Sequence, residues 1–157
     1  TSQYVNLNRA LAHGAEVELH GRLRADLTLE AAYIYTSTQI LEAPLAFDPL
    51  LAEGAPLLRR PRHSGVLRLT YLRPRWGGNL GGSFVGRRTD SDFLGLGVTH
   101  AAGYARVDAG AWYALNRYVT AYANVENILD RRYEESAGYP ALGANVRAGL
   151  RFRLGGE

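Results

Sequence analysis

Apolar and polar residues alternate along most of this chain, whereas the three-to-four-residue spacing of an amphipathic helix is nearly absent. A period of two places successive side chains on opposite faces of a β-strand. The clearest case is Val146–Leu154, where valine, alanine, leucine, phenylalanine and leucine alternate with three arginines and one glycine. The pattern therefore predicts an all-β protein.

Seven segments show this alternation and are predicted to be strands. They are Gly14–Leu23, Leu27–Thr36, Ser64–Leu72, Gly78–Arg87, Tyr104–Leu115, Tyr118–Val125 and Val146–Leu154, with Ser2–Leu7 as a candidate eighth. Segments of about 9–11 residues suit tilted strands that cross a membrane, whereas soluble strands are commonly about 5–6 residues long. Tyrosines lie near the ends of the apolar faces, where an aromatic girdle at a membrane interface is expected. These tyrosines are Tyr33, Tyr35, Tyr71 and Tyr113.

The connections between these segments are alternately short and long. Residues 23–27, 73–77 and 116–117 form short connections, whereas residues 37–63, 88–103 and 126–145 form long ones. Short periplasmic turns and long extracellular loops are typical of an up-and-down barrel in the outer membrane. The sequence therefore predicts an antiparallel up-and-down transmembrane β-barrel segment of seven to eight strands. A water-soluble β-barrel that binds an apolar ligand is an alternative, but it explains the alternation without explaining the sorted loops.

Composition and charge narrow the function further. The 157 residues are 46% hydrophobic and contain no cysteine, which excludes disulfide frameworks and thiolate metal sites. All 18 basic residues are arginine and the net charge is +3, yet the arginines are spread along the sequence among acidic residues. This dispersion argues against nucleic-acid binding, which favours a basic patch or stripe. No run approaches the roughly 18–20 apolar residues that a membrane helix needs.

The sequence contains no motif for enzymatic chemistry. A G-x-S-x-G elbow, a phosphate-binding glycine loop and an H-E-x-x-H zinc motif are all absent. We therefore predict no enzyme, no cofactor and no bound metal. Glu16, Glu18 and His20 share a strand face, for which a wet lumen wall is favoured over a metal or acid–base cluster. Asp90, Ser91 and Asp92 in a long loop could bind calcium through the carboxylates, but a solvated turn is favoured there.

The C-terminal third contains a recognisable series of motifs. Residues 127–133 (Asn-Ile-Leu-Asp-Arg-Arg-Tyr) resemble the N-L-L-D-x-x-Y signature near the end of TonB-dependent outer-membrane receptors, and residues 138–143 resemble the G-Y-P-x-P-G that follows it. The matching positions are Asn127, Asp130, Tyr133, Gly138, Pro140 and Gly143. Leu142 and Ala144 depart from the family pattern. Residues 6–16, 58–63 and 84–90 are similar to further motifs in family order, so the resemblance spans nearly the whole chain.

The resemblance is nearest to the cobalamin and siderophore receptors. It implies that residues 1–157 are a single region, the C-terminal part of an outer-membrane barrel of about 22 strands whose plug domain is absent from this sequence. The implied partners are outer-membrane lipid of a Gram-negative-type bacterium, a metal-chelate ligand such as cobalamin or a ferric siderophore, and the TonB protein acting through the missing plug. Candidate ligand contacts in the loops are Phe47, Asp90, Asp92, Phe93 and Tyr139.

The last strand has a further pattern of its own. Arg147, Gly149, Phe152 and Leu154 fit polar-x-Gly-x-x-aromatic-x-apolar, which resembles the C-terminal signal read by the barrel-assembly machinery. Addition of a strand to an unpaired edge supplies the physical basis of such recognition, although a good strand alone would also explain these residues.

The number of strands decides whether the chain could close by itself. Seven antiparallel strands cannot close, because the first and last run in the same direction. A small autonomous eight-stranded outer-membrane barrel with a structural or adhesive role would need Ser2–Leu7 to pair with Val146–Leu154, and this is the alternative function.

Overall fold

The computed structural model describes residues 9–43, 50–92, 94, 97–136 and 138–154, which form strands and connections. One antiparallel sheet has the order β1-β2-β3-β4-β7-β8-β11. Its strands are β1 (Arg9–Arg24), β2 (Leu27–Glu42), β3 (His63–Leu72), β4 (Trp76–Val85), β7 (Tyr104–Ala114), β8 (Val119–Glu126) and β11 (Asn145–Phe152). No helix in the described part of the chain is long and apolar enough to cross a membrane.

The seven predicted strands are confirmed, and β1 and β2 extend beyond their predicted ends. The candidate strand Ser2–Leu7 lies outside the described residues. Two stretches that were predicted as loops contain short hairpins, which is a correction: β5 (Arg88–Ser91) pairs with β6 (Val98–Ala101), and β9 (Glu134–Ser136) pairs with β10 (Tyr139–Pro140).

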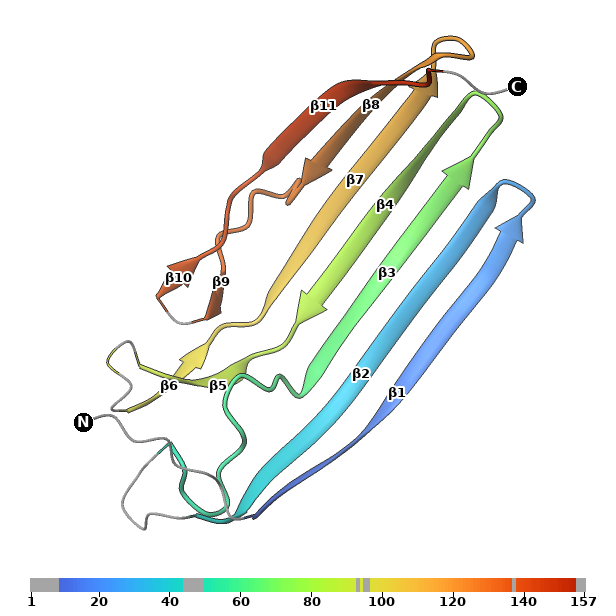
Figure 1. Cartoon of the computed structure of the whole chain (residues 1–157). Coiled ribbons are helices and arrows are strands. Elements are labelled where there is room, and N and C mark those ends of the chain that lie inside the picture. Colours follow the sequence, from blue (N-terminus) through green and yellow to red (C-terminus); the bar gives the residue numbers. More distant parts are fainter. Residues whose placement is uncertain (1–8, 44–49, 93, 95–96, 137, 155–157) are drawn as a thin grey trace.

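Connections of the two lengths lie at opposite ends of the sheet. Residues 25–26, 73–75 and 115–118 make the tight turns, and the long connections with both small hairpins gather at the other end (Figure 1). We call these the turn end and the loop end. β1 and β11 are the two edges, run in the same direction and do not pair with one another. The described residues therefore form an open segment of a barrel wall, and the predicted fold class is confirmed.

Cross-strand pairing sorts the side chains onto two chemically different faces. One row of paired residues from β1 to β11 consists of Gly21, Leu29, Leu69, Leu80, Ala109, Val125 and Val146. The neighbouring row on the opposite face consists of Arg22, Thr28, Thr70, Asn79, Gly110, Asn124 and Arg147. One face of the sheet is thus apolar and the other polar.

No second layer of described residues packs against the apolar face. Val17 is 63% exposed, Leu150 54% and Phe152 62%, and among the described residues only Ile40 and Ala101 are buried hydrophobic side chains. An apolar surface this extensive is unusual on a monomeric protein in water, where contiguous patches rarely exceed a few hundred Å². The soluble-barrel alternative requires these side chains to be enclosed, and the described residues do not enclose them.

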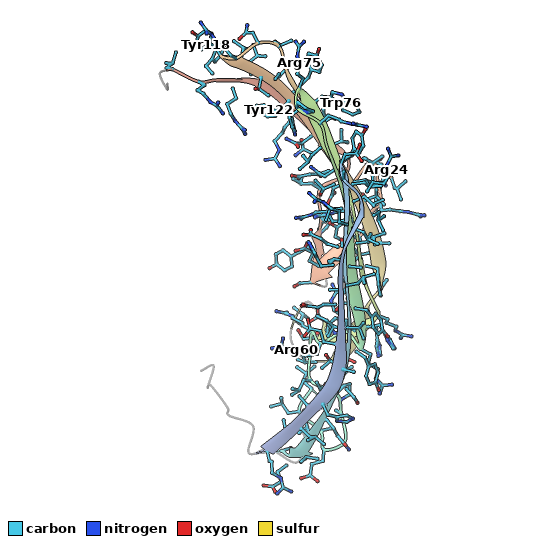
Figure 2. The ribbon with its side chains drawn as sticks, turned by 90° about the vertical axis from the view of Figure 1, so that its right-hand side faces the viewer. Arg24, Arg60, Arg75, Trp76, Tyr118 and Tyr122 are labelled. Carbon is cyan, nitrogen blue, oxygen red and sulfur yellow. The ribbon has the colours of Figure 1, made fainter. Side chains whose placement is uncertain are left out.

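The sheet is a curved layer when seen from its β1 edge, with Arg24 on the convex side and Tyr122 on the concave side (Figure 2). Tyr122 pairs with Gly149 and Trp112, which belong to the polar face. The polar face is therefore concave, as the wall of a water-filled lumen would be, and the apolar face is convex.

Aromatic side chains border the apolar face at both ends, as the tyrosine positions predicted. At the loop end, Tyr33 Oη lies 2.7 Å from His63 Nδ1, and the Tyr33 ring stacks with Phe84 at 6.3 Å. At the turn end, the rings of Tyr71 and Trp76 lie 5.0 Å apart. Phe84 and Trp76 are separated by eight positions of β4, or ~26 Å along the strand and ~20 Å along the axis of a barrel with ~40° tilt. This height is comparable with the ≈25 Å apolar band of outer-membrane barrels.

The turn end of β1 contains an irregularity that strict alternation does not predict. A register shift between Arg22 and Arg24 brings Arg24 opposite Leu27, whose next partner is Tyr71. An extra residue in one strand reverses the faces beyond it. Arg24 therefore lies on the apolar, convex side.

Candidate functional site

The β5–β6 hairpin at the loop end is built around two buried charged residues. Arg88 and Asp90 alternate with Thr89 and Ser91 along β5, and both charged side chains are buried. The solvated turn favoured for Asp90 is therefore wrong, since this carboxylate is fully buried. A buried charge is costly unless it is paired and hydrogen-bonded, so the partners of these two residues hold the hairpin in place.

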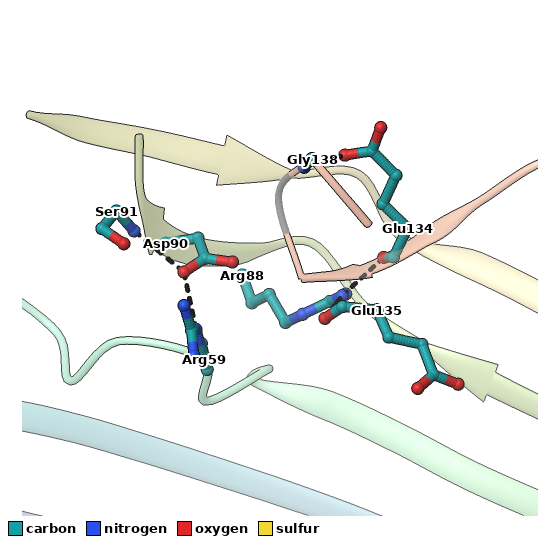
Figure 3. A network of polar contacts seen from close by, with 7 residues as sticks. All are labelled: Arg59, Arg88, Asp90, Ser91, Glu134, Glu135 and Gly138. Atoms are coloured by element: carbon teal, nitrogen blue, oxygen red, sulfur yellow. Dashed lines mark hydrogen bonds and ion pairs between the residues drawn. The ribbon is translucent and has the colours of Figure 1, made fainter. Parts of the chain in front are cut away.

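Asp90 connects the hairpin to the β2–β3 connection. Arg59 Nε donates to Asp90 Oδ1 at 2.8 Å, and the backbone N–H of Ser91 donates to the same oxygen at 2.9 Å (Figure 3). The backbone N–H of Arg59 also donates to Thr89 O at 2.7 Å. Two hydrogen bonds, one of them charge-assisted, thus fix the first long connection to the second.

Arg88 connects the same hairpin to the third long connection. Its guanidinium donates to the backbone carbonyls of Glu134, at 2.7 Å, and of Glu135 (Figure 3). The guanidinium carbon also lies 5.8 Å from the ring centre of Tyr104, which stacks on Tyr133 at 4.0 Å. All three long connections are therefore joined into one hydrogen-bonded assembly at the loop end, which we call the loop cluster.

Asn127 organises the chain where it leaves β8. Its backbone has a positive φ of 52°, a conformation that asparagine tolerates better than most residues. The buried side-chain amide donates to Arg131 O at 2.9 Å and Leu142 O at 3.2 Å and accepts from the backbone N–H of Arg131 at 3.0 Å. Its own backbone N–H donates to Asp108 Oδ1 at 2.8 Å. One side chain thus closes both ends of the third connection.

The spacing of the other signature residues has a similar physical basis. Asp130 also has a positive φ, of 47°, and its Oδ1 accepts from the backbone N–H of Ala144 at 2.8 Å. A Cβ at Gly143 would lie only 2.5 Å from that oxygen, so the contact favours glycine. Gly138 has a φ of 85° in the β9–β10 turn, where its N–H donates to Glu134 Oε2 at 2.9 Å.

A pocket of about 450 Å³ lies under the third connection, within the ≈300–1,000 Å³ usual for ligand sites. Arg106, Glu126 and Asn145 line it from the loop-end parts of β7, β8 and β11, and Glu135 and Tyr139 line it from the β9–β10 region. The two glutamates and the arginine offer both hydrogen-bond acceptors and donors, so the pocket suits a polar ligand.

The predicted ligand contacts have different surroundings. Tyr139 lines the pocket and is 68% exposed. Asp90 is buried in the loop cluster, and Asp92 lies at the end of β5, where its N–H donates to Gly97 O at 2.8 Å. Phe47 and Phe93 lie outside the described residues. The strand residues Arg106, Glu126 and Asn145 were not predicted from the sequence as ligand contacts. Each lies on the polar face of its strand, close to the loop end, and this position could have indicated them.

The predicted acidic and histidine grouping on β1 is exposed on the polar face. His20 Nδ1 lies 3.5 Å from Glu30 Oε1 of β2. In the part of the chain that the structure describes, no group of three histidine or acidic side chains is arranged to hold a metal ion.

Arg147, Gly149 and Phe152 of the predicted assembly signal lie on the edge strand β11, and Leu154 follows the end of that strand. Arg147 forms an ion pair with Glu126, whereas the apolar Phe152 and Leu154 are exposed. A Cβ at Gly149 would lie 2.8 Å from the hydroxyl of Tyr122 on β8, whose ring covers this glycine. Among the described strands, β11 pairs with β8 alone, so its other side is available for the addition of a further strand.

Comparison with known proteins gives a consistent set of similarities. The family model for the TonB-dependent receptor-like β-barrel matches residues 1–128. The chain is 35% identical over 132 residues to the metal-pseudopaline receptor CntO of Pseudomonas aeruginosa, covering 80% of this chain and 18% of that protein. It is 34% identical over 151 residues to the probable TonB-dependent receptor BfrD of Bordetella pertussis, covering 90% of this chain and 20% of that protein.

A solved structure gives the same fold. The siderophore receptor PiuA from Acinetobacter baumannii superposes with a TM-score of 0.76 at 21% identity, over 91% of this chain and 22% of that one. The chain thus spans about a fifth of the length of the curated relatives that it matches.

Proposed function

Because the chain belongs to the TonB-dependent receptor β-barrel family, we propose that it forms the C-terminal part of the barrel wall of a receptor that imports a scarce metal chelate. The family resemblance read from the sequence is confirmed. The observation that best supports an import role for this segment is the polar pocket beneath the loop cluster, at the end of the sheet where an external ligand would arrive.

The barrel segment is proposed to lie in the outer membrane of a Gram-negative bacterium. Its homologues are TonB-dependent receptors, which are outer-membrane proteins. The convex apolar face, bordered by aromatic rings at both ends, would contact hydrocarbon, and the loop end would be extracellular. Recognition of β11 by the barrel-assembly machinery is a further part of this proposal, supported by its exposed edge and its residue pattern.

The ligand class is proposed from the chemistry of the pocket. A ferric siderophore, another metal–metallophore complex or cobalamin offers many oxygen and nitrogen atoms that could pair with Arg106, Glu126 and Asn145. The metal chelate bound by the similar receptor CntO, as its name states, supports this class. The concave polar face would surround a plug domain, through which the TonB protein would supply energy. In the complete receptor, Phe47, Asp92, Phe93 and Tyr139 remain the proposed loop contacts, whereas the fully buried Asp90 would act only by holding the β5–β6 hairpin in place.

Uptake and binding by the complete receptor test this proposal. Deletion of the receptor gene should abolish high-affinity uptake of one labelled chelate, with radiolabelled cobalamin and ferric siderophores assayed side by side. Tyr139→Ala should weaken binding of that chelate by roughly 5- to 30-fold, since an aromatic contact in a binding site is often worth about 1–2 kcal/mol. Tyr118→Ala is the matched control, because Tyr118 is also an exposed tyrosine, at 51% against 68% for Tyr139, but lies at the turn end. Equal effects of the two substitutions would argue against the pocket.

The alternative of a small autonomous barrel has a separate test. The described edge strands β1 and β11 do not pair with one another, so closure would depend on residues 1–8. Refolding of the 157-residue chain alone into detergent should give no compact heat-modifiable species on a gel if it is one segment of a larger barrel. A sharp heat-shifted band would instead favour the small barrel.

A further inference from the structure

The fold gathers arginines at the turn end. Seven of the 18 arginines fall in residues 22–26, 73–75, 115–118 and 151–154, together with one of the 15 acidic residues, Asp26. The rest of the sequence therefore holds 11 arginines and 14 acidic residues. Arginines that are dispersed along the sequence therefore come together in the folded chain, because three turns and the end of β11 meet at one end of the sheet (Figure 1).

Three of these arginines form a connected cluster with the aromatic border of the apolar face. Arg24 Nε lies 3.5 Å and Arg73 Nη2 lies 2.6 Å from the carboxylate of Asp26, whose side chain is only 10% exposed. The backbone of Asp26 is also fixed, because its carbonyl accepts from the N–H of Leu72 at 2.9 Å. One largely buried carboxylate thus holds two arginines from neighbouring turns side by side, while the two arginine side chains remain 68% and 45% exposed.

Aromatic rings continue the cluster to a third arginine. Arg73 Nε donates to Tyr71 Oη at 2.7 Å, and Tyr71 lies against Trp76 at 5.0 Å. Trp76 pairs with Tyr113, whose ring lies 5.7 Å beneath the guanidinium carbon of Arg75. The hydrogen bond to Tyr71 and the charge of Asp26 raise the pKa of Arg73 above its ordinary value.

We propose that Arg24, Arg73 and Arg75 form a binding site for the phosphate headgroup of an anionic phospholipid, with Trp76 beside the acyl chains. Guanidinium groups match phosphate oxygens in a bidentate geometry. A membrane lipid, rather than free phosphate, is the occupant, because the cluster borders the exposed apolar face and lies on its convex side (Figure 2). The inference rests on the proposed placement of this face in a membrane, and it assigns the turn end to the leaflet that holds such lipids.

The expected preference follows from the charge. Three arginines and one aspartate give the cluster a net charge of two, and a basic residue at an anionic membrane surface is worth roughly a fivefold preference. Phosphatidylglycerol should therefore be retained about 25-fold better than phosphatidylcholine. The complete receptor is purified in detergent, incubated with an equal mixture of the two lipids, and its bound lipids are counted by native mass spectrometry.

The variant R24Q/R73Q/R75Q should reduce this preference to about twofold or less. The matched control R22Q/R68Q/R151Q removes the same charge from the polar face, where these arginines lie, and should retain the preference. Heat-modifiable gel mobility of both variants establishes that the barrel is intact, so loss of the preference in an intact barrel separates this inference from the proposed function.

Three outcomes would overturn the inference. Equal retention of the two lipids by the wild type would show that the arginine cluster does not select anionic lipid, and an acidic protein surface would then be the better partner for it. Equal loss in both triple variants would indicate unspecific attraction by net charge. Displacement of phosphatidylglycerol by inorganic phosphate, but not by sodium chloride at matched ionic strength, would indicate a site for free phosphate.

Discussion

Replacing Ala109 by arginine tests which face of the sheet contacts hydrocarbon. Ala109 on β7 pairs with Leu80, which lies four residues from Trp76 and four from Phe84 along β4. Ala109 therefore lies midway between the two aromatic borders, ~10 Å from each along the barrel axis at ~40° tilt. A charge at the midplane of a lipid-facing surface costs ≈2–4 kcal/mol, so we expect Ala109→Arg to destabilise the folded receptor by that amount.

Two matched substitutions distinguish the effect of the sheet face from the effect of depth in the membrane. Ala105→Arg lies on the same face and strand but pairs with Phe84 at the loop-end border, where the cost falls to ≈0–1 kcal/mol. Asn79→Arg lies at nearly the same height as Ala109 but on the polar face, so its guanidinium stays in water and the cost should be small.

The assay is folding of the complete receptor into lipid vesicles over a urea series, with the folded fraction read from heat-modifiable gel mobility. The expected order of destabilisation is Ala109→Arg well above Ala105→Arg and Asn79→Arg. A receptor that tolerates Ala109→Arg but fails to fold with Asn79→Arg would refute the assignment of the apolar face to lipid. Equal effects of Ala109→Arg and Ala105→Arg would refute the position of the membrane midplane.

Two further substitutions test the packing described above. Asp90→Ala should weaken the attachment of the β5–β6 hairpin by about 1–2 kcal/mol, a value at the low end for a charge-assisted hydrogen bond because Arg59 is well exposed. Amide hydrogen exchange should accelerate at Arg59 and Ser91 and stay unchanged in β3. Uniform acceleration across the sheet would contradict a local role for Asp90. Gly149→Ala should displace the Tyr122 ring and lower the free energy of unfolding by about 1 kcal/mol. Gly21→Ala is the control and should be neutral, because its new Cβ would meet nothing within 4 Å. Equal effects of the two substitutions in the urea series would contradict the contact between Gly149 and the Tyr122 ring.

Residues in the loop cluster show what the sequence could not predict. The β5–β6 hairpin is held by Arg59, which is 31 residues from Asp90, and by carbonyls of residues 134 and 135 that Arg88 reaches across 46 and 47 residues. A stretch of four residues has too little local preference to define a strand without such partners. The pocket is likewise decided by distant segments, since strand residues from β7, β8 and β11 line it together with the third connection.

The alternation of side chains by itself determined the strands, the two faces and the sorted connections, because the period of two is a local property of extended backbone. The identity of Asn127 also indicated the turn after β8, since few residues tolerate a positive φ and also offer a side chain that hydrogen-bonds to nearby backbone groups. Only the tertiary structure decided that Arg24 lies on the convex face and that seven arginines gather at one end. A single register shift and the meeting of separate turns depend on pairing between strands, which no local pattern encodes.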